Sequence, residues 1–201
     1  MLFRSPGTIV PDATSDEEWK WVVESLKEIY GHSEAAGVVL ALEPLNRFET
    51  YFLNRAEQAT ELAKAVGPNC GVCLDAFHIN IEEEDLHAAI LSTKGRLVDF
   101  HVAENNRWPA GMGDYDWKKL IETLKSAGYD GALTAEFVAP IDRTPANKYP
   151  NALETNFTDI SPEQLQFIID HGSSTLTEEF YDFLVKRNAD ELLPMIGKGS
   201  R

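Results

Sequence analysis

Four side chains able to hold a metal ion occur between residues 43 and 136, each at the end of a short apolar run. Glu43 ends GVVLALE and Asp75 ends CGVCLD, while His101 lies near the end of RLVDFHV and Glu136 near the end of GALTAEF. Three carboxylates and one imidazole suit a divalent cation of intermediate hardness, such as Mn²⁺, Mg²⁺ or Co²⁺, rather than a thiolate zinc site. Any one of the four taken alone also fits a helix cap or a hydrogen-bonded packing residue.

Parallel strands are the elements that would bring these four side chains together. The apolar runs predict four strands of similar length, near 38–43, 71–75, 97–102 and 132–136. The four side chains are 32, 26 and 35 residues apart, the length of one strand plus one helix. Since ligands gather at the C-terminal ends of parallel strands, the four groups should lie at one level of the sheet. Turn residues exposed to solvent would not be expected to recur at the same level of successive strands.

Helix-like stretches separate the predicted strands, over 15–37, 54–67, 82–95 and 114–128. In the first stretch, Ser15 and Glu18 match the pattern of a capping box. The second would begin at an Asn54 cap and end at Gly67, and the third would end at Gly95. The last stretch has four apolar residues on one helical face, Trp117, Leu120, Ile121 and Leu124. The alternation of strands and helices predicts an α/β fold with a parallel sheet.

The remainder of the chain follows a different pattern. Residues 138–160 are rich in Pro, Asn and Asp, which predicts a long loop excursion. Ser161 and Pro162 would then open the C-terminal helices over 161–195, the last of them from about Thr177 to Leu193. We therefore treat residues 1–201 as a single, partial domain.

Composition and charge exclude several classes of partner. The net charge of −15 argues against nucleic acids and against anionic membranes, since both bind through Lys and Arg. No apolar run approaches the ~20 residues needed to cross a bilayer. The segment MLFRSPGTIVPD is too short and too interrupted by Pro and Gly for a signal peptide. These features predict a soluble, cytoplasmic protein that binds a neutral or cationic ligand.

The two cysteines, Cys70 and Cys73, have C-x-x-C spacing. A zinc site would need a second such pair or two matching histidines, and the sequence has neither. A redox dithiol would lie at a helix N-terminus after a strand, whereas this pair enters an apolar strand. Ordinary packing in the core is the prediction for both thiols.

Three further polar residues follow the strand ends closely. Glu49 lies six residues after Glu43, His78 three after Asp75, and Arg107 six after His101. Each also has an ordinary interpretation, such as a surface ion pair for Arg107 or a helix N-terminal charge for Glu49.

Together, LEPLNRFE, LDAFHINIEE, FHVAENNRWPAGMGDYDW and TAEF resemble the ketose 3-epimerases of the D-tagatose, D-psicose and L-ribulose type. These enzymes belong to the xylose-isomerase-like TIM-barrel superfamily, and the resemblance covers roughly residues 1–140. It implies an incomplete parallel (β/α) barrel of about five βα units. Its five strands, the four predicted above and one more within MLFRS, would correspond to the family's fourth to eighth.

The resemblance also implies roles for the residues singled out above. Glu43, Asp75, His101 and Glu136 would bind one divalent ion, most simply Mn²⁺, and Glu43 and Glu136 would be the two acid–base groups. Glu49, His78 and Arg107 would hold an open-chain ketose. Inverting C3 requires proton removal from one face and return on the other through an enediolate, hence two carboxylates. A metal ion on the ketone oxygen would stabilise that intermediate.

Two alternatives to the 3-epimerase stay open. One is a sibling sugar or hydroxy-keto acid isomerase or dehydratase with the same ligands and a different pocket. The other is a truncated barrel fragment without catalytic activity, because the resemblance implies three further βα units that precede residue 1 in the family and close the barrel. An open sheet would need a second copy of the chain or another partner to cover its edge. The preferred sugar, its phosphorylation, the bound metal and the oligomeric state do not follow from the sequence.

Overall fold

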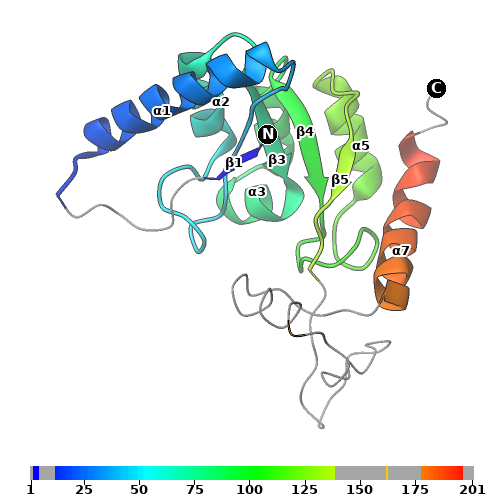
Figure 1. Cartoon of the computed structure of the whole chain (residues 1–201). Coiled ribbons are helices and arrows are strands. Elements are labelled where there is room, and N and C mark those ends of the chain that lie inside the picture. The colour runs from blue at the N-terminus through cyan, green and yellow to red at the C-terminus, as the bar shows by residue number, and fades with distance from the viewer. Residues whose placement is uncertain (1, 5–11, 139–161, 163–177, 197–201) are drawn as a thin grey trace.

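Five parallel strands form one sheet in the computed structural model, which describes residues 2–4, 12–138, 162 and 178–196. The strands pair in chain order, β1 to β5 (Figure 1). Their bounds are β1 Leu2–Arg4, β2 Ala41–Glu43, β3 Gly71–Asp75, β4 Leu97–Val102 and β5 Leu133–Ala135. All four neighbouring pairs are parallel, which confirms the predicted α/β architecture, including the strand within MLFRS.

The strand register aligns only two of the four polar strand ends, Asp75 and His101, which pair across β3 and β4. The pairing of Leu42 with Val72 puts Glu43 two residues short of the level of Asp75, and the pairing of His101 with Thr134 puts Glu136 two residues beyond that of His101. Glu43 and Asp75 are the last residues of their strands, and Glu136 directly follows β5. The strands β2 and β5, with three residues each, are shorter than predicted. Strands β2, β3 and β4 nevertheless end at the predicted residues, and β5 ends one residue before the predicted Glu136.

Helices cover the apolar face of the sheet. They are α1 Ser15–Ala35, α2 Ala56–Val66, α3 Ala76–Glu82, α4 Leu86–Ser92, α5 Trp117–Ser126 and α7 Glu178–Ile196. Side chains alternate between the two faces of a strand, so Leu74 and Phe100 point into the helix layer, whereas Asp75 and His101 point the other way. Both apolar side chains are fully buried. The predicted apolar face of α5 is buried in the same core, through Trp117, Leu120, Ile121 and Leu124.

The N-terminus of α1 differs from the prediction by one residue. The capping box consists of Thr14 and Glu17, not Ser15 and Glu18. Thr14 and Ser15 each have a glutamate three residues later, so local pattern alone fits both. Glu18 instead accepts a hydrogen bond from the Tyr51 hydroxyl at 2.7 Å, a tertiary contact that selects the earlier register.

Several other predicted helix ends were also wrong. The predicted helix over 82–95 begins only at Leu86, because Ala76–Glu82 form the separate helix α3. Arg55, not Asn54, is the N-cap of α2, because the Asn54 amide donates to the carbonyls of Leu45 and Thr50 in the preceding loop. The Gln58 side chain accepts from the backbone N–H groups of Asn54 and Arg55 in its place. Helix α4 ends at Ser92, before the predicted Gly95, whereas Gly67 ends α2 as predicted.

The C-terminal helix α7 packs beside α5 (Figure 1), where the Lys125 ammonium donates to the Met195 carbonyl at 3.0 Å. It extends to Ile196, three residues beyond the predicted end. The predicted loop at 138–160 and the predicted helix start at Ser161 lie outside the described residues, apart from Val138 and Pro162. Among the described helices, none is long and apolar enough to cross a membrane.

Replacing Leu74 by Ala should lower the free energy of unfolding by about 2–5 kcal/mol, because it leaves a cavity beneath the helices on the central strand. Urea denaturation followed by circular dichroism measures this difference. Leu91→Ala is the matched control, since this leucine on α4 is 45% exposed and its truncation should change stability by less than about 1 kcal/mol. Equal losses for the two variants would contradict the assigned faces.

Candidate metal centre

Glu43, Asp75, His101 and Glu136 converge at the C-terminal ends of the strands. Each offers one ligand atom, and these four atoms all lie within 4.8 Å of one another. The Nδ1 atom of His101 lies 3.1 Å from a Glu43 carboxylate oxygen and 3.9 Å from one of Asp75, and it also contacts Glu136. The predicted convergence of these four groups is therefore present in the structure.

The cluster is largely withdrawn from solvent. The side chains of Glu43 and Asp75 are fully buried, that of His101 is 7% exposed and that of Glu136 is 25% exposed. Asp75 is also the N-cap of α3, where its carboxylate accepts from the Phe77 N–H at 2.7 Å. This bond holds the carboxylate at the end of the sheet, at the point where strand β3 becomes helix.

Arg107 supplies positive charge to the cluster. Its guanidinium lies 2.6 Å from an Asp75 oxygen and 3.6 Å from a Glu136 oxygen. It also stacks over the Phe77 ring, 4.6 Å from the ring centre. The Arg107 side chain is only 16% exposed, so the interpretation as a surface ion pair is wrong.

The loop after β4 holds Arg107 in an unusual backbone conformation. Arg107 has a φ of 66°, a left-handed geometry that costs a residue with a side chain about 1–3 kcal/mol. Its N–H donates to the Glu104 carbonyl at 2.9 Å, and its carbonyl accepts from the Val138 N–H at 2.8 Å. Tertiary contacts thus maintain the strained backbone that directs the guanidinium to Asp75.

Glu104 organises the same loop, and the sequence reasoning missed it. Its buried carboxylate accepts from the Trp117 indole N–H at 2.6 Å and from the backbone N–H groups of Gly111 and Tyr115. Helix α7 supports the loop from outside, because Asn188 accepts from the Ala110 N–H and Arg187 donates to the Gly111 carbonyl. In the sequence, Glu104 is simply a carboxylate between a predicted strand and a predicted helix, and such residues are common in loops.

Burial, hydrogen bonds and neighbouring charges shift the pKa values of the cluster. Burial raises the pKa of Asp75 to about 7, against the opposing effect of Arg107. Burial alone would lower the pKa of His101, but hydrogen bonds with Cys73, Glu136 and Glu43 raise it well above its ordinary value. For Glu136, burial would raise the pKa, yet hydrogen bonds with His101 and Asp75 and the charge of Arg107 hold it below its usual range. Without a metal ion, protons and Arg107 therefore balance the negative charge.

The same residues fit a divalent cation. With His101 neutral, three carboxylates against one guanidinium leave two negative charges, which a dication would balance. Carboxylate oxygens with one imidazole form the donor set that suits Mn²⁺, Mg²⁺ or Co²⁺. A cation there would replace the proton on His101 and need not displace any apolar group.

His78 lies close to both Asp75 and Glu49. The buried His78 has Nε2 at 3.9 Å from an Asp75 oxygen and Nδ1 at 3.8 Å from a Glu49 oxygen. Asn46, a residue that the sequence reasoning did not select, connects them: its amide nitrogen lies 2.8 Å from His78 Nδ1 and donates to Glu49 at 2.9 Å. Of the three predicted substrate-binding residues, Arg107 and His78 thus lie close to Asp75, and Glu49 lies close to His78.

The two cysteines have different surroundings. Both are buried and neither forms a disulfide. Cys70 belongs to the apolar core, as predicted, whereas Cys73 forms a hydrogen bond with His101. Asp99 is a further neighbour of His101, with a carboxylate oxygen 3.6 Å from Nε2, and Thr134 donates to its other oxygen. Period-two alternation along β3 and β4 places Cys73 and Asp99 one layer below Asp75 and His101.

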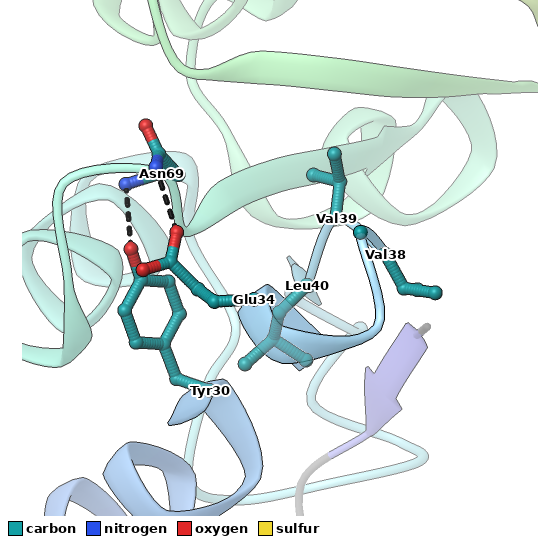
Figure 2. A pocket seen from close by; sticks show the side chains of 7 residues that line it. Tyr30, Glu34, Val38, Val39, Leu40 and Asn69 are labelled. Carbon is teal, nitrogen blue, oxygen red and sulfur yellow. Dashed lines mark hydrogen bonds between the residues drawn. The ribbon is translucent and has the colours of Figure 1, made fainter. Parts of the chain in front are cut away.

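A separate cavity of about 190 Å³ lies at the opposite end of the strands (Figure 2). It is lined by Gly37 to Leu40, ahead of β2, and by Tyr30, Glu34 and Asn69. The Asn69 amide donates to Glu34 at 2.7 Å, and the Asn69 backbone N–H donates to the Tyr30 hydroxyl at 3.2 Å. Its polar groups are engaged with one another, and none belongs to the cluster.

Comparison with known proteins places the chain in a family. The sequence model described as xylose isomerase-like TIM barrel matches residues 1–157. The chain belongs to the xylose isomerase-like TIM-barrel family. It is 39% identical over 120 residues to the D-psicose 3-epimerase of Ruminiclostridium cellulolyticum, covering 59% of this chain and 41% of that protein. The resemblance to ketose 3-epimerases is thereby confirmed.

Other xylose isomerase-like proteins extend the comparison. The crystal structure of D-psicose 3-epimerase with D-tagatose from Clostridium cellulolyticum H10 matches with a TM-score of 0.60 at 37% identity, over 65% of this chain and 47% of that one. A 3-dehydro-D-guloside 4-epimerase of Escherichia coli is 30% identical over 67% of this chain and 51% of that protein. The chain thus spans about half the length, or less, of these relatives.

Replacing Glu104 by Gln should lower the free energy of unfolding by about 1–3 kcal/mol, because the new amide turns an NH₂ group toward N–H donors that a carboxylate now accepts from. Urea denaturation followed by Trp fluorescence measures the change. Glu61→Gln, at an exposed position on α2, is the matched control and should stay within about 0.5 kcal/mol of the wild type. An unchanged midpoint for Glu104→Gln would remove this residue from the support of the Arg107 loop.

Proposed function

We propose that this chain carries the metal and acid–base centre of an isomerase that epimerises a ketose at C3. The observation that carries the proposal is the convergence of two glutamates, Glu43 from β2 and Glu136 after β5, on one point with Asp75 and His101. The names of the similar proteins support the reaction class, since D-psicose 3-epimerase acts on a ketose at C3. Because the chain spans only part of those proteins, activity and substrate are proposals for it.

Glu43, Asp75, His101 and Glu136 would hold one divalent cation, for which we propose Mn²⁺. When bound, the cation polarises the C2 carbonyl of the ketose and stabilises the negative charge of the enediolate. Buried surroundings strengthen this effect, because water does not screen the charges of the fully buried Glu43 and Asp75.

The two glutamates would exchange the C3 proton. Epimerisation requires one base to remove the proton from one face of C3 and a second acid to return a proton to the other face. Glu43 and Glu136 come from strands separated by β3 and β4, so a substrate between them could meet one carboxylate on each face. A base that acted on one face alone would return the proton to the face it left.

Glu49, His78 and Arg107 would orient the open-chain sugar. Arg107 and His78 both lie close to the same Asp75 oxygen, and Asn46 connects the His78 ring with the Glu49 carboxylate. These groups offer hydrogen-bond donors and acceptors for hydroxyl and carbonyl oxygens. Fixing the sugar in this way would align its C3–H bond with the bases.

A sibling reaction is the second candidate. The relative from Escherichia coli is named a 4-epimerase, so the same fold is compatible with chemistry at another carbon. Inversion at C4 would require the two glutamates to flank C4 in place of C3. A cytoplasmic location, and a second copy of the chain covering the sheet edge, stay predictions.

Manganese binding should become tighter as the pH rises. Metal ligands must be deprotonated, and in the metal-free protein the raised pKa values of His101 and Asp75, the latter about 7, keep protons on both below neutral pH. The apparent affinity should rise up to about 100-fold per pH unit below pH 7, where two protons leave, and about tenfold per unit above it. Isothermal titration calorimetry in buffers of different ionisation enthalpy measures both affinity and proton release.

His101→Ala tests the ligand assignment in the same titration. Removing the imidazole should lower Mn²⁺ affinity and abolish one of the released protons, whereas His87→Ala on α4 should leave both unchanged. The His87 ring lies 2.8 Å from the Thr123 hydroxyl, away from the cluster. Unchanged affinity in His101→Ala would exclude this residue as a ligand.

Hydrogen exchange at C3 separates the reactions. With D-psicose or D-fructose in D₂O, deuterium should enter C3 of both sugars in the wild type. In Glu43→Gln and in Glu136→Gln, net inversion should stop while one of the two epimers still exchanges slowly, because a single base remains. Nuclear magnetic resonance and mass spectrometry locate the label, with D-psicose 3-epimerase of Ruminiclostridium cellulolyticum as the positive control.

Other labelling patterns would contradict the proposal. Deuterium at C1 and never at C3 would indicate an aldose–ketose isomerase, and deuterium at C4 would indicate the sibling reaction. Absence of exchange in this chain alongside full exchange in the control would favour the catalytically inactive fragment.

A further inference from the structure

A second set of metal ligands overlaps the oxygen-rich cluster. The Cys73 thiol, the Glu43 carboxylate and the His101 imidazole offer ligand atoms that lie within 4.8 Å of one another. This set keeps Glu43 and His101 from the first cluster and has a sulfur atom in place of the Asp75 and Glu136 oxygens. All three members are buried.

The fold separates Cys73 from its sequence partner. Cys70 immediately precedes β3 and is packed in the apolar core among the helices. Cys73 lies two residues before Asp75 on the same strand, so it shares a face with Asp75 and points toward the ligand side of the sheet. It is fully buried and forms a hydrogen bond with His101. The C-x-x-C spacing therefore does not describe a dithiol that acts as a unit.

The chemistry of this second set differs from that of the first. A thiolate selects thiophilic ions such as Zn²⁺ and Cd²⁺, whereas sites made mainly of carboxylates suit Mn²⁺ and Mg²⁺. One Cys, one His and one carboxylate with an open fourth position suit a four-coordinate zinc-type ion. On binding, the thiol would release its proton to solvent, and the thiolate with Glu43 would neutralise the two charges of the ion.

We propose that Glu43, Cys73 and His101 form a binding site for thiophilic divalent cations that overlaps the manganese-type site. Because both sites require Glu43 and His101, occupation by Zn²⁺ or Cd²⁺ excludes the ion held with Asp75 and Glu136. A thiophilic ion is thus a competitive ligand of this centre, through a cysteine that has no part in the proposed epimerisation. The inference concerns cation binding and does not depend on turnover.

Cadmium titration of the reduced chain tests the site directly. A cadmium–thiolate bond produces an ultraviolet charge-transfer band that a site made only of oxygen and nitrogen ligands lacks. The band should grow to one equivalent of Cd²⁺ in the wild type and in Cys70→Ser, and it should be absent in Cys73→Ser. Mn²⁺ should produce no band in any variant.

Competition tests the overlap. In protein first loaded with Mn²⁺, each equivalent of Cd²⁺ should release one equivalent of Mn²⁺, seen as the electron paramagnetic resonance signal of the free ion. Glu136→Gln should lower Mn²⁺ affinity by more than about tenfold, since even residues that only support a ligand contribute that much, while keeping the cadmium band. Cys73→Ser should show the opposite pattern, and near-ultraviolet circular dichroism of each variant reports its folding.

Specific outcomes would overturn the inference. A cadmium band that persists in Cys73→Ser, or no band in the wild type, would show that Cys73 is not a ligand. A band without release of Mn²⁺ would show that the two ions occupy separate sites. Loss of Mn²⁺ binding in every variant with the cadmium band intact would refute the proposed manganese centre and leave the thiophilic site standing.

Discussion

Three carboxylates packed closely together, two of them fully buried, are the constraint on which the rest of the structure depends. Ionised groups removed from water are unstable unless a positive charge accompanies them. Arg107 reaches Asp75 at 2.6 Å, and His101 contacts Glu43 and Glu136 through one nitrogen atom. These partners balance the charge without metal, and a divalent cation can take over from the His101 proton. The proposed cation site would therefore exchange protons for a cation on binding metal.

The surrounding elements hold this charged centre in place. Parallel strands bring Glu43, Asp75 and His101 to one end of the sheet, and the apolar residues between them anchor the strands under the helices. Arg107 depends on a different kind of support, a loop closed by the buried Glu104 and braced by α7. Charge, loop and helix packing are thus coupled, because displacement of the loop would leave Asp75 buried without its guanidinium.

The side chains one layer below the cluster add a thiol to the possible ligand atoms. Cys73 and Asp99 are paired in the strand register, one step below Asp75 and His101. His101 contacts both layers, with Nδ1 toward the carboxylates and Nε2 on the side of Asp99. A single imidazole therefore lies between an oxygen-rich set of ligands and a set that contains a thiol. Preference between manganese-type and zinc-type ions would then depend on residues from two adjacent layers of the same strands.

Much of the site could be predicted from the sequence because strand ends are a local property. An apolar run of five or six residues ends at a definite residue, and the parallel arrangement brings successive ends together, which identified Glu43, Asp75, His101 and Glu136. The strands followed from apolar runs, and the long helices followed from apolar residues at helical spacing. Local patterns were insufficient where two registers fitted equally, as at Thr14 and Ser15, whose choice depends on the contact between Glu18 and Tyr51.

Only the tertiary structure decided which groups neutralise the negative charge of the cluster. The sequence left Arg107 as either a surface ion pair or a site residue, and the left-handed turn closed by Glu104 and Val138 places it against Asp75. Asn46, Asp99 and Glu104 had no distinguishing pattern, because their partners lie 3 to 35 residues away in the chain. Cys70 and Cys73 look equivalent in sequence, and the alternation of side chains along the strand places one in the apolar core and the other beside Glu43 and His101.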